Sequence, residues 1–266
     1  MAALLIFFFG AAAGSFANVC IFRLPRGKSI VMPGSQCPAC GTPIKWFDNV
    51  PIFSFIMLKA KCRNCKGRIP ARYFLVELLT AGCFLLLYLK FSISPELFIF
   101  MIFTALLIIM GFIDIEHRII PDELDIPGII LGLALSAVYP PLHQLTRPWD
   151  GFLNSPWLIS FLSSLSGVLA GGGTLLFIAA IGGAIFKKEA MGGGDIKLIA
   201  MIGAFLGWQL ALLTIFISAF LGSVIGIIMK FRTGSSYIPY GPYLACGAII
   251  SVLAGENIIL WYINSL

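Results

Sequence analysis

The segment from Leu97 to Asp114 reads LFIFMIFTALLIIMGFID, an apolar run that ends in a carboxylate. A second aspartate, Asp195, follows a triple glycine in the segment MGGGDIKL, residues 191–198. Charge near lipid is costly, so an acid that persists there indicates a functional site. Both acids are expected at helix ends on one side of a membrane. Paired carboxylates can share a proton and activate water without a metal, so the pair predicts a shared site.

The composition indicates an all-α polytopic membrane protein. Of the 266 residues, 59% are hydrophobic and 11% are charged, and the mean hydropathy is +0.98. This length has room for about eight helices of roughly 20 residues each and one small soluble insert. The expected spans are about 4–22, 73–90, 97–115, 123–139, 158–186, 195–207, 209–229 and 242–263. The sixth and seventh nearly merge around Gly207 and Trp208, so a count of seven stays open.

The placement of the basic residues predicts the topology. Residues 23–72 hold ten Lys and Arg, and alternate loops bring the total on that side to 16, against only Lys90 and Arg147 on the other. The positive-inside rule makes the basic side cytoplasmic and the N-terminus external. The first apolar run has no preceding basic residue and no cleavage site, so we interpret it as a retained span. The net charge of +6 then indicates a lipid bilayer, and no nucleic acid, as the partner of these residues.

Three regions follow from this pattern. Residues 1–22 form the first transmembrane helix, residues 23–72 a cytoplasmic insert, and residues 73–266 the remaining membrane core. The insert is rich in Pro, Cys, Gly, Lys and Arg and lacks a long apolar run. A segment of this size cannot build much of a core, so it needs a covalent or metal cross-link.

Four cysteines supply that cross-link. They form two C-x-x-C pairs: Cys37 with Cys40, and Cys62 with Cys65. Each pair can present two sulfurs to one tetrahedral ion, which predicts a structural Zn²⁺ site. Two disulfides are the alternative, but thiols stay reduced on a cytoplasmic face. Four thiolates leave no open position for water, so this zinc is not expected to be catalytic. Gly41 and Gly67 suit the tight turns after each pair.

The two aspartates are expected at helix ends of opposite polarity. Pro121 disfavours helix at the residue before it, which places Asp114 near the cytoplasmic C-terminus of the third span. Asp195 begins the sixth span. A helix N-terminus favours an ionised carboxylate and a C-terminus disfavours it, so we expect Asp195 as the base and Asp114 as the acid. Because close acids titrate as a pair, the assignment is coupled. The alternative is a pair of helix caps or surface charges.

Neighbouring residues are expected to support the two acids. The glycines allow close backbone approach and unusual dihedral angles before Asp195. Asp122, Glu123 and Asp125 follow Pro121 at a helix start, which is typical of capping acids, although Asp122 could also support the site. Lys197 does not share a helix face with Asp195, and we expect it at the membrane edge or against a substrate backbone. The supporting set is Gly192, Gly194, Lys197, Pro121 and Asp122.

Motifs along nearly the whole chain resemble those of the type IV prepilin peptidases, integral membrane aspartic proteases of the GxGD class. They are GSFxNVxIxRLP (14–25), the paired C-x-x-C motifs, RY (72–73) before ELLT (77–80), ID (113–114), IPD (120–122), GxGD (192–195) and IPYGPYLA (238–245). One departure is the interval of 81 positions between Asp114 and Asp195, whose excess falls in the Pro-rich loop 140–157. The predicted cytoplasmic site is unaffected by that loop.

This resemblance implies a maturation enzyme of the bacterial inner membrane that removes the basic leader of type IV prepilins and pseudopilins. Asp114 and Asp195 would activate water and protonate the leaving amine. Many members then methylate the new N-terminus with S-adenosylmethionine. The sequence has no G-x-G-x-x-G after a strand, so we expect the methyl donor between the insert and the membrane helices, with no residues assigned.

A basic leader should be drawn to acids on the cytoplasmic face. The candidates are Glu116, Asp122, Glu123 and Glu189. Contacts with lipid or with neighbouring basic residues are the alternative roles for these acids. For the protein as a whole, a proton-coupled transporter is an alternative in which the paired acids relay protons. A non-enzymatic assembly scaffold is another. A transporter would place its acids near the midplane, whereas these lie near one face.

Overall fold

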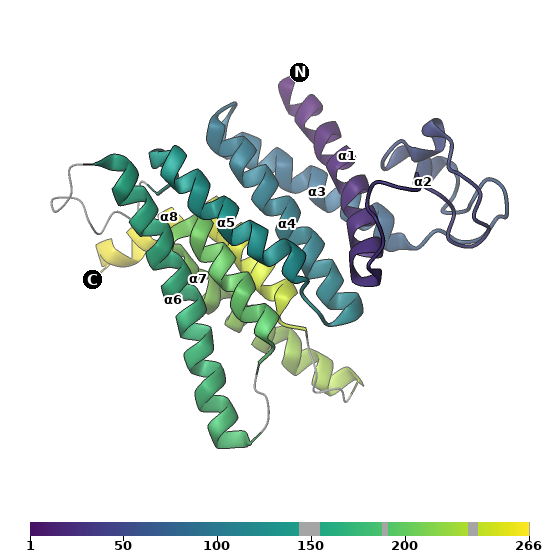
Figure 1. Ribbon diagram of the computed structural model, residues 1–266. Coiled ribbons are helices and arrows are strands. Elements are labelled where there is room, and N and C mark those ends of the chain that lie inside the picture. Colours follow the sequence, from purple (N-terminus) through teal and green to yellow (C-terminus); the bar gives the residue numbers. More distant parts are fainter. Residues whose placement is uncertain (144–154, 188–190, 234–238, 266) are drawn as a thin grey trace. The chain divides into compact units, whose positions relative to one another are not determined.

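The structure is a computed structural model that describes residues 1–143, 155–187, 191–233 and 239–265 (Figure 1). In these ranges every regular element is a helix, which confirms the all-α prediction. The elements are α1 (Ala2–Arg23), η1 (Leu24–Arg26), η2 (Trp46–Asn49), α2 (Phe53–Met57), α3 (Ala71–Phe91), α4 (Pro95–His117), α5 (Asp122–Val138), η3 (Pro140–His143), α6 (Pro156–Phe186), α7 (Gly193–Thr233) and α8 (Gly241–Ser265). The chain divides into two compact units, Met1–Ile113 and Asp114–Leu266.

Within the described residues, six helices are long and apolar enough to cross a membrane: α1, α3, α4, α6, α7 and α8. They carry large apolar side chains on their outer surfaces, among them Leu89 and Phe216, which are 67% and 72% exposed. Such surfaces suit lipid better than water. The helix α5 has 17 residues with three acids in its first turn, so its apolar stretch is shorter. The protein is therefore a multi-pass membrane protein.

In the first unit, α1 packs against α3 through two glycines one helical turn apart. A Cβ atom on Gly10 would lie 2.8 Å from the Cα of Ala81, and one on Gly14 would lie 2.7 Å from the Cα of Glu77. Small residues at this spacing let two helix backbones approach closely in a membrane. The seam holds the two helices that flank the cysteine-rich insert.

In the second unit, α7 reverses direction at Gly207. That residue has φ 76° and ψ 174°, a conformation open almost only to glycine. A Cβ on Gly171 would lie 2.8 Å from the Ile199 carbonyl oxygen and 3.5 Å from the Ala211 Cβ. In one continuous helix, Ile199 and Ala211 would be about 18 Å apart. The element is therefore a hairpin of two arms, residues 193–206 and 208–233, as expected for separate sixth and seventh spans.

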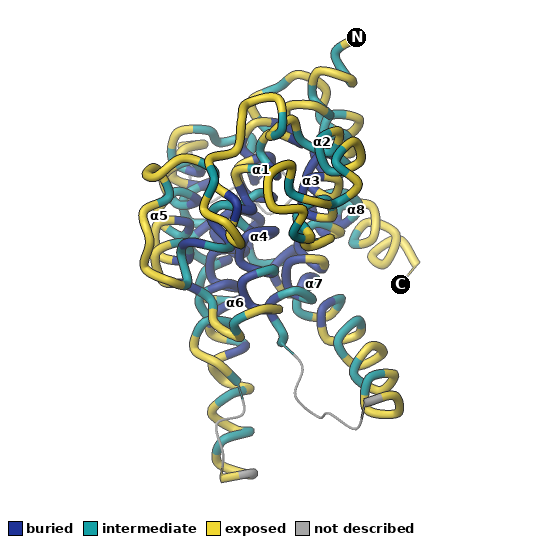
Figure 2. The backbone as a smooth tube through the Cα atoms, turned by 90° about the vertical axis from the view of Figure 1, so that its right-hand side faces the viewer, coloured by how far each residue is buried: buried dark blue, intermediate teal, exposed yellow. Residues whose placement is uncertain are grey.

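The hairpin sets the direction of its neighbours. The helix α6 runs antiparallel to the first arm, and Ser164 Oγ donates a hydrogen bond to the Ala204 carbonyl at 2.6 Å. The helix α5 runs parallel to this arm, since Gly132 lies against Ala204 while Ile120, just before α5, lies against Gly194. Burial is densest along the first arm, from Leu198 to Leu206 (Figure 2). The starts of α5 and α7 therefore share one end of the unit.

The last helix completes that end. Gly255 of α8 lies against Leu210, and Gly247 lies against the Thr214 carbonyl. The helix α8 is thus antiparallel to the second arm. Because this arm returns toward the start of the first, the beginning of α8 reaches the same end of the unit as Asp195.

Candidate functional site

The four cysteines of the insert gather as predicted. Their sulfur atoms all lie within 4.8 Å of one another, and those of Cys37 and Cys65 are 3.9 Å apart. A tetrahedral ion with metal–sulfur bonds of about 2.3 Å needs sulfurs roughly 3.8 Å apart. All seven cysteines, each within the described ranges, are free thiols. The cluster therefore could hold one metal ion, and the disulfide alternative has no support.

The two C-x-x-C turns share one backbone design. The Cys37 amide donates to the Thr42 carbonyl at 3.0 Å, and the Cys62 amide donates to the Gly67 carbonyl at 2.8 Å. Isolated bridges flank each turn, between Gln36 and Pro43 and between Lys61 and Arg68. Gly41 has the left-handed conformation expected of it, with φ 69°. After the second pair, the left-handed residue is Lys66, with φ 59°, and the expectation for Gly67 was wrong.

Side chains around the cluster reinforce it. A hydrogen bond with the Thr42 hydroxyl lowers the pKa of Cys40 to about 6. Metal binding needs the thiolate form, which the environment of Cys40 favours. At Cys65 the Gly67 amide lowers the pKa, but hydrogen bonds with the other cysteines and burial raise it to about 11. Arg63, inside the second turn, binds Asp48 of η2 with Nη2 2.6 Å from Oδ1, and this contact lowers the pKa of Asp48.

Asp114 occupies the last turn of α4 and is only 6% exposed. Its Oδ2 accepts a hydrogen bond from the Gly241 amide at 2.9 Å. Gly241 is the first residue of α8, where amide groups have no partner within the helix. A Cβ at position 241 would lie 2.8 Å from the same oxygen. Glycine is therefore needed for the carboxyl group to reach the helix start.

Asp195 lies in the first turn of α7 and is half-buried. The charge of Asp114 acts on its carboxyl group, and both acids lie at the same end of the second unit. The Tyr240 hydroxyl, 2.7 Å from Ser218 Oγ, also lies near Asp195, and burial raises the pKa of Tyr240. The second unit thus brings together the two acids that the sequence singled out.

The helix ends around the two acids differ less than expected. Asp114 ends α4, but its carboxyl group contacts the N-terminus of α8. Asp195 lies at the N-terminus of α7. Both carboxyl groups therefore lie at helix N-termini, where the dipole acts in the same sense. Asp114 nevertheless lies in the C-terminal turn of α4, as expected, so the assignment of Asp195 as base and Asp114 as acid stays a prediction.

The glycines before Asp195 act through close approach. A Cβ on Gly194 would lie 2.9 Å from the Ile120 Cβ, and one on Gly192 would lie 3.5 Å from Asp195 Oδ2. The positive-φ glycines of the described chain do not include either residue, so the expected unusual dihedrals are not found there. Pro121 is buried and precedes the first residue of α5. Gly194 therefore packs the start of α7 against Ile120, just before α5.

Lys197 pairs with Asp122 through Nζ and Oδ1 at 2.6 Å. This ion pair links α7 to α5 at the surface, a role the sequence did not predict for the lysine. Glu116 and Glu123 are exposed, and Glu116 lies 4.0 Å from His117. Glu189 lies outside the described residues.

Asp125 differs most from its expected role as a capping acid. It is 0% exposed, and neither carboxylate oxygen has a hydrogen-bond partner. The charges of Asp122, Lys197 and Asp195 act on it. A buried carboxyl group without partners lowers the stability of the folded protein, so such groups are found mainly at functional sites. Asp125 is buried because it lies on the face of α5 that packs against the protein. The neighbouring sequence does not indicate which face that is.

Tyr240 and Gly241 were also missed as site residues. They belong to the segment IPYGPYLA that carried the resemblance, and glycine followed by proline at a helix start was the available signal. Their closeness to Asp195 and Asp114 depends on the return of the second arm of α7, which no local pattern shows.

Replacing Asp125 by Asn should stabilise the protein. The change keeps the volume and removes a carboxylate without partners, so we expect the free energy of unfolding at pH 8 to rise by about 1–3 kcal/mol. Thermal unfolding in detergent measures it. The control Asp122→Asn breaks an exposed ion pair and should change stability by less than about 1 kcal/mol. A loss of stability in Asp125→Asn would show that the acid has stabilising partners.

Two sequence families match the chain. The Bacterial Peptidase A24 N-terminal domain matches residues 8–91, and the Type IV leader peptidase family matches residues 101–227. Three similar curated proteins are each named "Prepilin leader peptidase/N-methyltransferase". The Bacillus subtilis protein is 34% identical over 98% of this chain and 97% of its own length, and the Pseudomonas aeruginosa protein is 33% identical over 96% and 91%.

The Myxococcus xanthus protein is 36% identical over 87% of this chain, which spans 64% of that relative's length. No solved structure matches. Both family matches include parts of the site: the four cysteines lie in the first, and Asp114 and Asp195 lie in the second. On these matches and the described geometry, the chain belongs to the type IV leader peptidase family.

Proposed function

We propose that this protein is a membrane aspartic endopeptidase that removes the basic leader from type IV prepilins and pseudopilins. One observation carries the proposal: two acids from distant segments, Asp114 and Asp195, share one end of the second unit at helix N-termini. A transporter relay would need acids near the midplane, so this arrangement favours hydrolysis.

The acid pair can perform both proton transfers of peptide hydrolysis. One carboxylate accepts a proton from water as the oxygen attacks the scissile carbonyl carbon, and the other carboxyl group donates a proton to the leaving amine. The Gly241 amide fixes Asp114, and Tyr240 lies near Asp195. Because both acids sit at helix N-termini, either one can begin as the base, and the pair works as a unit.

Neutralising either acid should abolish cleavage. Asp114→Asn and Asp195→Asn keep the side-chain volume but remove the shared proton, so we expect the rate to fall at least about 1000-fold. A gel-shift assay with a purified prepilin in liposomes measures it. Glu96→Gln, at the opposite end of α4, is the matched control and should cleave at the normal rate. Full proteolysis by either Asn variant would refute the proposed mechanism.

The exposed acids beside Asp114 would capture the leader. Glu116 and Glu123 are exposed and close to Asp114 in sequence, so they are the proposed partners for basic side chains, while Asp122 is held by Lys197. From the positive-inside rule we infer that the site lies on the cytoplasmic face, with the N-terminus external and the protein in a bacterial inner membrane. Labelling of the insert from each side of the membrane would test this orientation.

A double variant tests capture by charge. Glu116→Gln with Glu123→Gln should raise the KM for a basic leader about three- to tenfold at low salt and leave kcat unchanged, since exposed charges act on encounter and weak binding. A leader with its Lys and Arg replaced by Gln is the control and should show no further change. Equal effects on both leaders would exclude this role.

The insert, residues 23–72, would bind one structural Zn²⁺ through Cys37, Cys40, Cys62 and Cys65. The sulfur spacing and the Cys40 environment support this ion. The insert lies in the sequence between the first span (residues 1–22) and the membrane core (residues 73–266). The ion would stabilise this insert, which has little hydrophobic core of its own.

Metal analysis of the purified protein should give one zinc per chain. Cys40→Ser should lower that content and make the insert more sensitive to protease, because structural zinc contributes folding energy. Cys246→Ser, far from the cluster in sequence and on α8, is the matched control. Unchanged zinc content in Cys40→Ser would contradict the assignment.

We further propose that the protein methylates the new N-terminal amine with S-adenosylmethionine, since the names of its relatives include the term N-methyltransferase. Bound in the protein, this cofactor supplies an electrophilic methyl group. A site for it must accept a cationic sulfonium and a purine, and the described chain has a cavity with suitable walls.

A further inference from the structure

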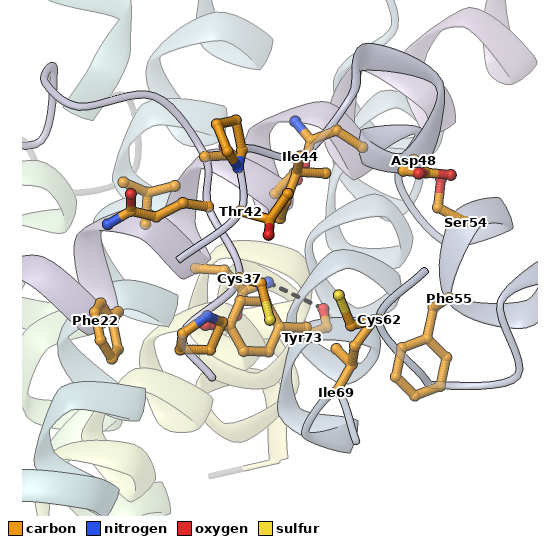
Figure 3. A pocket seen from close by; sticks show the side chains of 18 of the residues that line it. Phe22, Cys37, Thr42, Ile44, Asp48, Ser54, Phe55, Cys62, Ile69 and Tyr73 are labelled. Carbon is orange, nitrogen blue, oxygen red and sulfur yellow. Dashed lines mark hydrogen bonds between the residues drawn. The ribbon is translucent and has the colours of Figure 1, made fainter. Parts of the chain in front are cut away.

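A large cavity lies within the first unit, between the cysteine-rich insert and the helices α1 and α3 (Figure 3). Its volume is about 1170 Å³. Small-molecule sites usually occupy about 300–1,000 Å³, so this cavity has room for a nucleoside-sized ligand. None of its lining residues belongs to the acid pair, so it is separate from the proposed peptidase site.

The cavity wall holds two acids: Asp48, which is paired with Arg63, and Glu77 of α3, which is 8% exposed. Its Oε2 accepts a hydrogen bond from the Ile52 amide at 2.7 Å, and its carboxyl group also interacts with the Ser15 hydroxyl. Both donors are neutral, and no basic side chain in the described ranges pairs with it. A buried carboxylate needs a cation to offset its lost hydration. A cationic ligand in the cavity would supply one.

A second polar group in the wall lacks a partner. Asn18 of α1 is 1% exposed, and its Nδ2 donates to the carbonyls of Gly14 and Tyr73 at 3.3 and 3.0 Å. Its Oδ1 has no hydrogen-bond partner. Buried amide oxygens are normally satisfied, so this atom favours a ligand that brings a donor.

The remaining walls match the rest of such a ligand. Phe22 and Tyr73 line the cavity on the side of the membrane helices, and Phe55 lines it on the insert side (Figure 3). One face of each ring is covered: Arg26 lies over Phe22, Arg72 lies over Tyr73, and Phe74 stacks on Phe55. A purine ring would contact the opposite faces. Arg23 directs its guanidinium to the carbonyls of Ser29, Pro33 and Gly34, so it does not neutralise Glu77.

We propose that this cavity binds S-adenosylmethionine, with Glu77 as the charge partner of its cationic end, Asn18 as a hydrogen-bond acceptor, and the aromatic walls in contact with its adenine. The inference rests on the proposed methylation and assigns its residues. Cys37 and Cys62 also line the cavity, so the zinc-loaded insert forms one wall of the site.

Binding to the full-length, zinc-loaded protein in detergent tests the charge partnership. The ligands are S-adenosylmethionine, its amine-bearing analogue sinefungin, and S-adenosylhomocysteine, whose thioether is neutral. Glu77→Gln should weaken binding of the first two about tenfold and of the thioether less than about threefold, since only the additional positive charge loses its partner. Isothermal titration measures each affinity. Equal losses for all three ligands would mean that Glu77 has only a structural role.

Asp48→Asn is the matched control. Asp48 lines the same cavity but is already paired with Arg63, so its loss should not change the preference among the ligands. If Glu77→Gln fails to fold, ultraviolet cross-linking of adenosine-labelled S-adenosylmethionine to the unaltered protein gives a second measurement. Label on peptides from residues 12–77 supports the site, and label confined to residues 114–265 overturns it.

Asp114→Asn separates this inference from the peptidase. That variant should lose cleavage and keep the affinity of the unaltered protein for S-adenosylmethionine. A protein that cleaves prepilin but neither binds nor uses the methyl donor would refute the methylation and, with it, this site. A protein that methylates normally, while Glu77→Gln binds every ligand as before, would refute the site alone.

Discussion

The hydrogen bond from the Gly241 amide to Asp114 is the contact on which the second unit's chemistry depends. A carboxyl group in an apolar protein body must find donors, and the unpaired amides of a helix N-terminus are the strongest ones available there. The contact joins the end of α4 to the start of α8. It holds Asp114 in one orientation, while Asp195 arrives from a different helix.

The hairpin at Gly207 explains why the two acids meet. If α7 were one straight helix, the second arm would continue away from Asp195. Instead the arm returns, and Ser218 on it binds the Tyr240 hydroxyl just before α8 begins. Backbone conformation at one glycine therefore decides whether Tyr240 and Gly241 lie at the end where the first arm begins. Ser164 and the glycines of α6 then pack against the first arm and keep the reversal tight.

Local sequence patterns predicted the helices, the cysteine cluster and the two acids. An apolar run indicates a helix in lipid, and C-x-x-C spacing indicates a turn that presents two sulfurs. Each of these patterns lies within a short segment, so it can be recognised in the sequence alone. The burial of Asp125, the ion pair of Lys197 with Asp122, and the contact of Asp114 with α8 all depend on which helix faces pack together. The polarity argument for Asp114 was incomplete for this reason, because it considered only the helix that carries the residue and not α8, which its carboxyl group contacts.

The buried acids of the two units differ in how their charge can be balanced. Asp114 and Asp195 are neighbours, so one proton shared between them lowers the charge of both, and the pair needs water rather than a cation. Glu77 has no acidic neighbour to share a proton with, and its donors are neutral. A lone carboxyl group in that setting either keeps its proton or is balanced by a positive charge from a ligand. A carboxyl group thus suits hydrolysis where it is paired and cation binding where it is single.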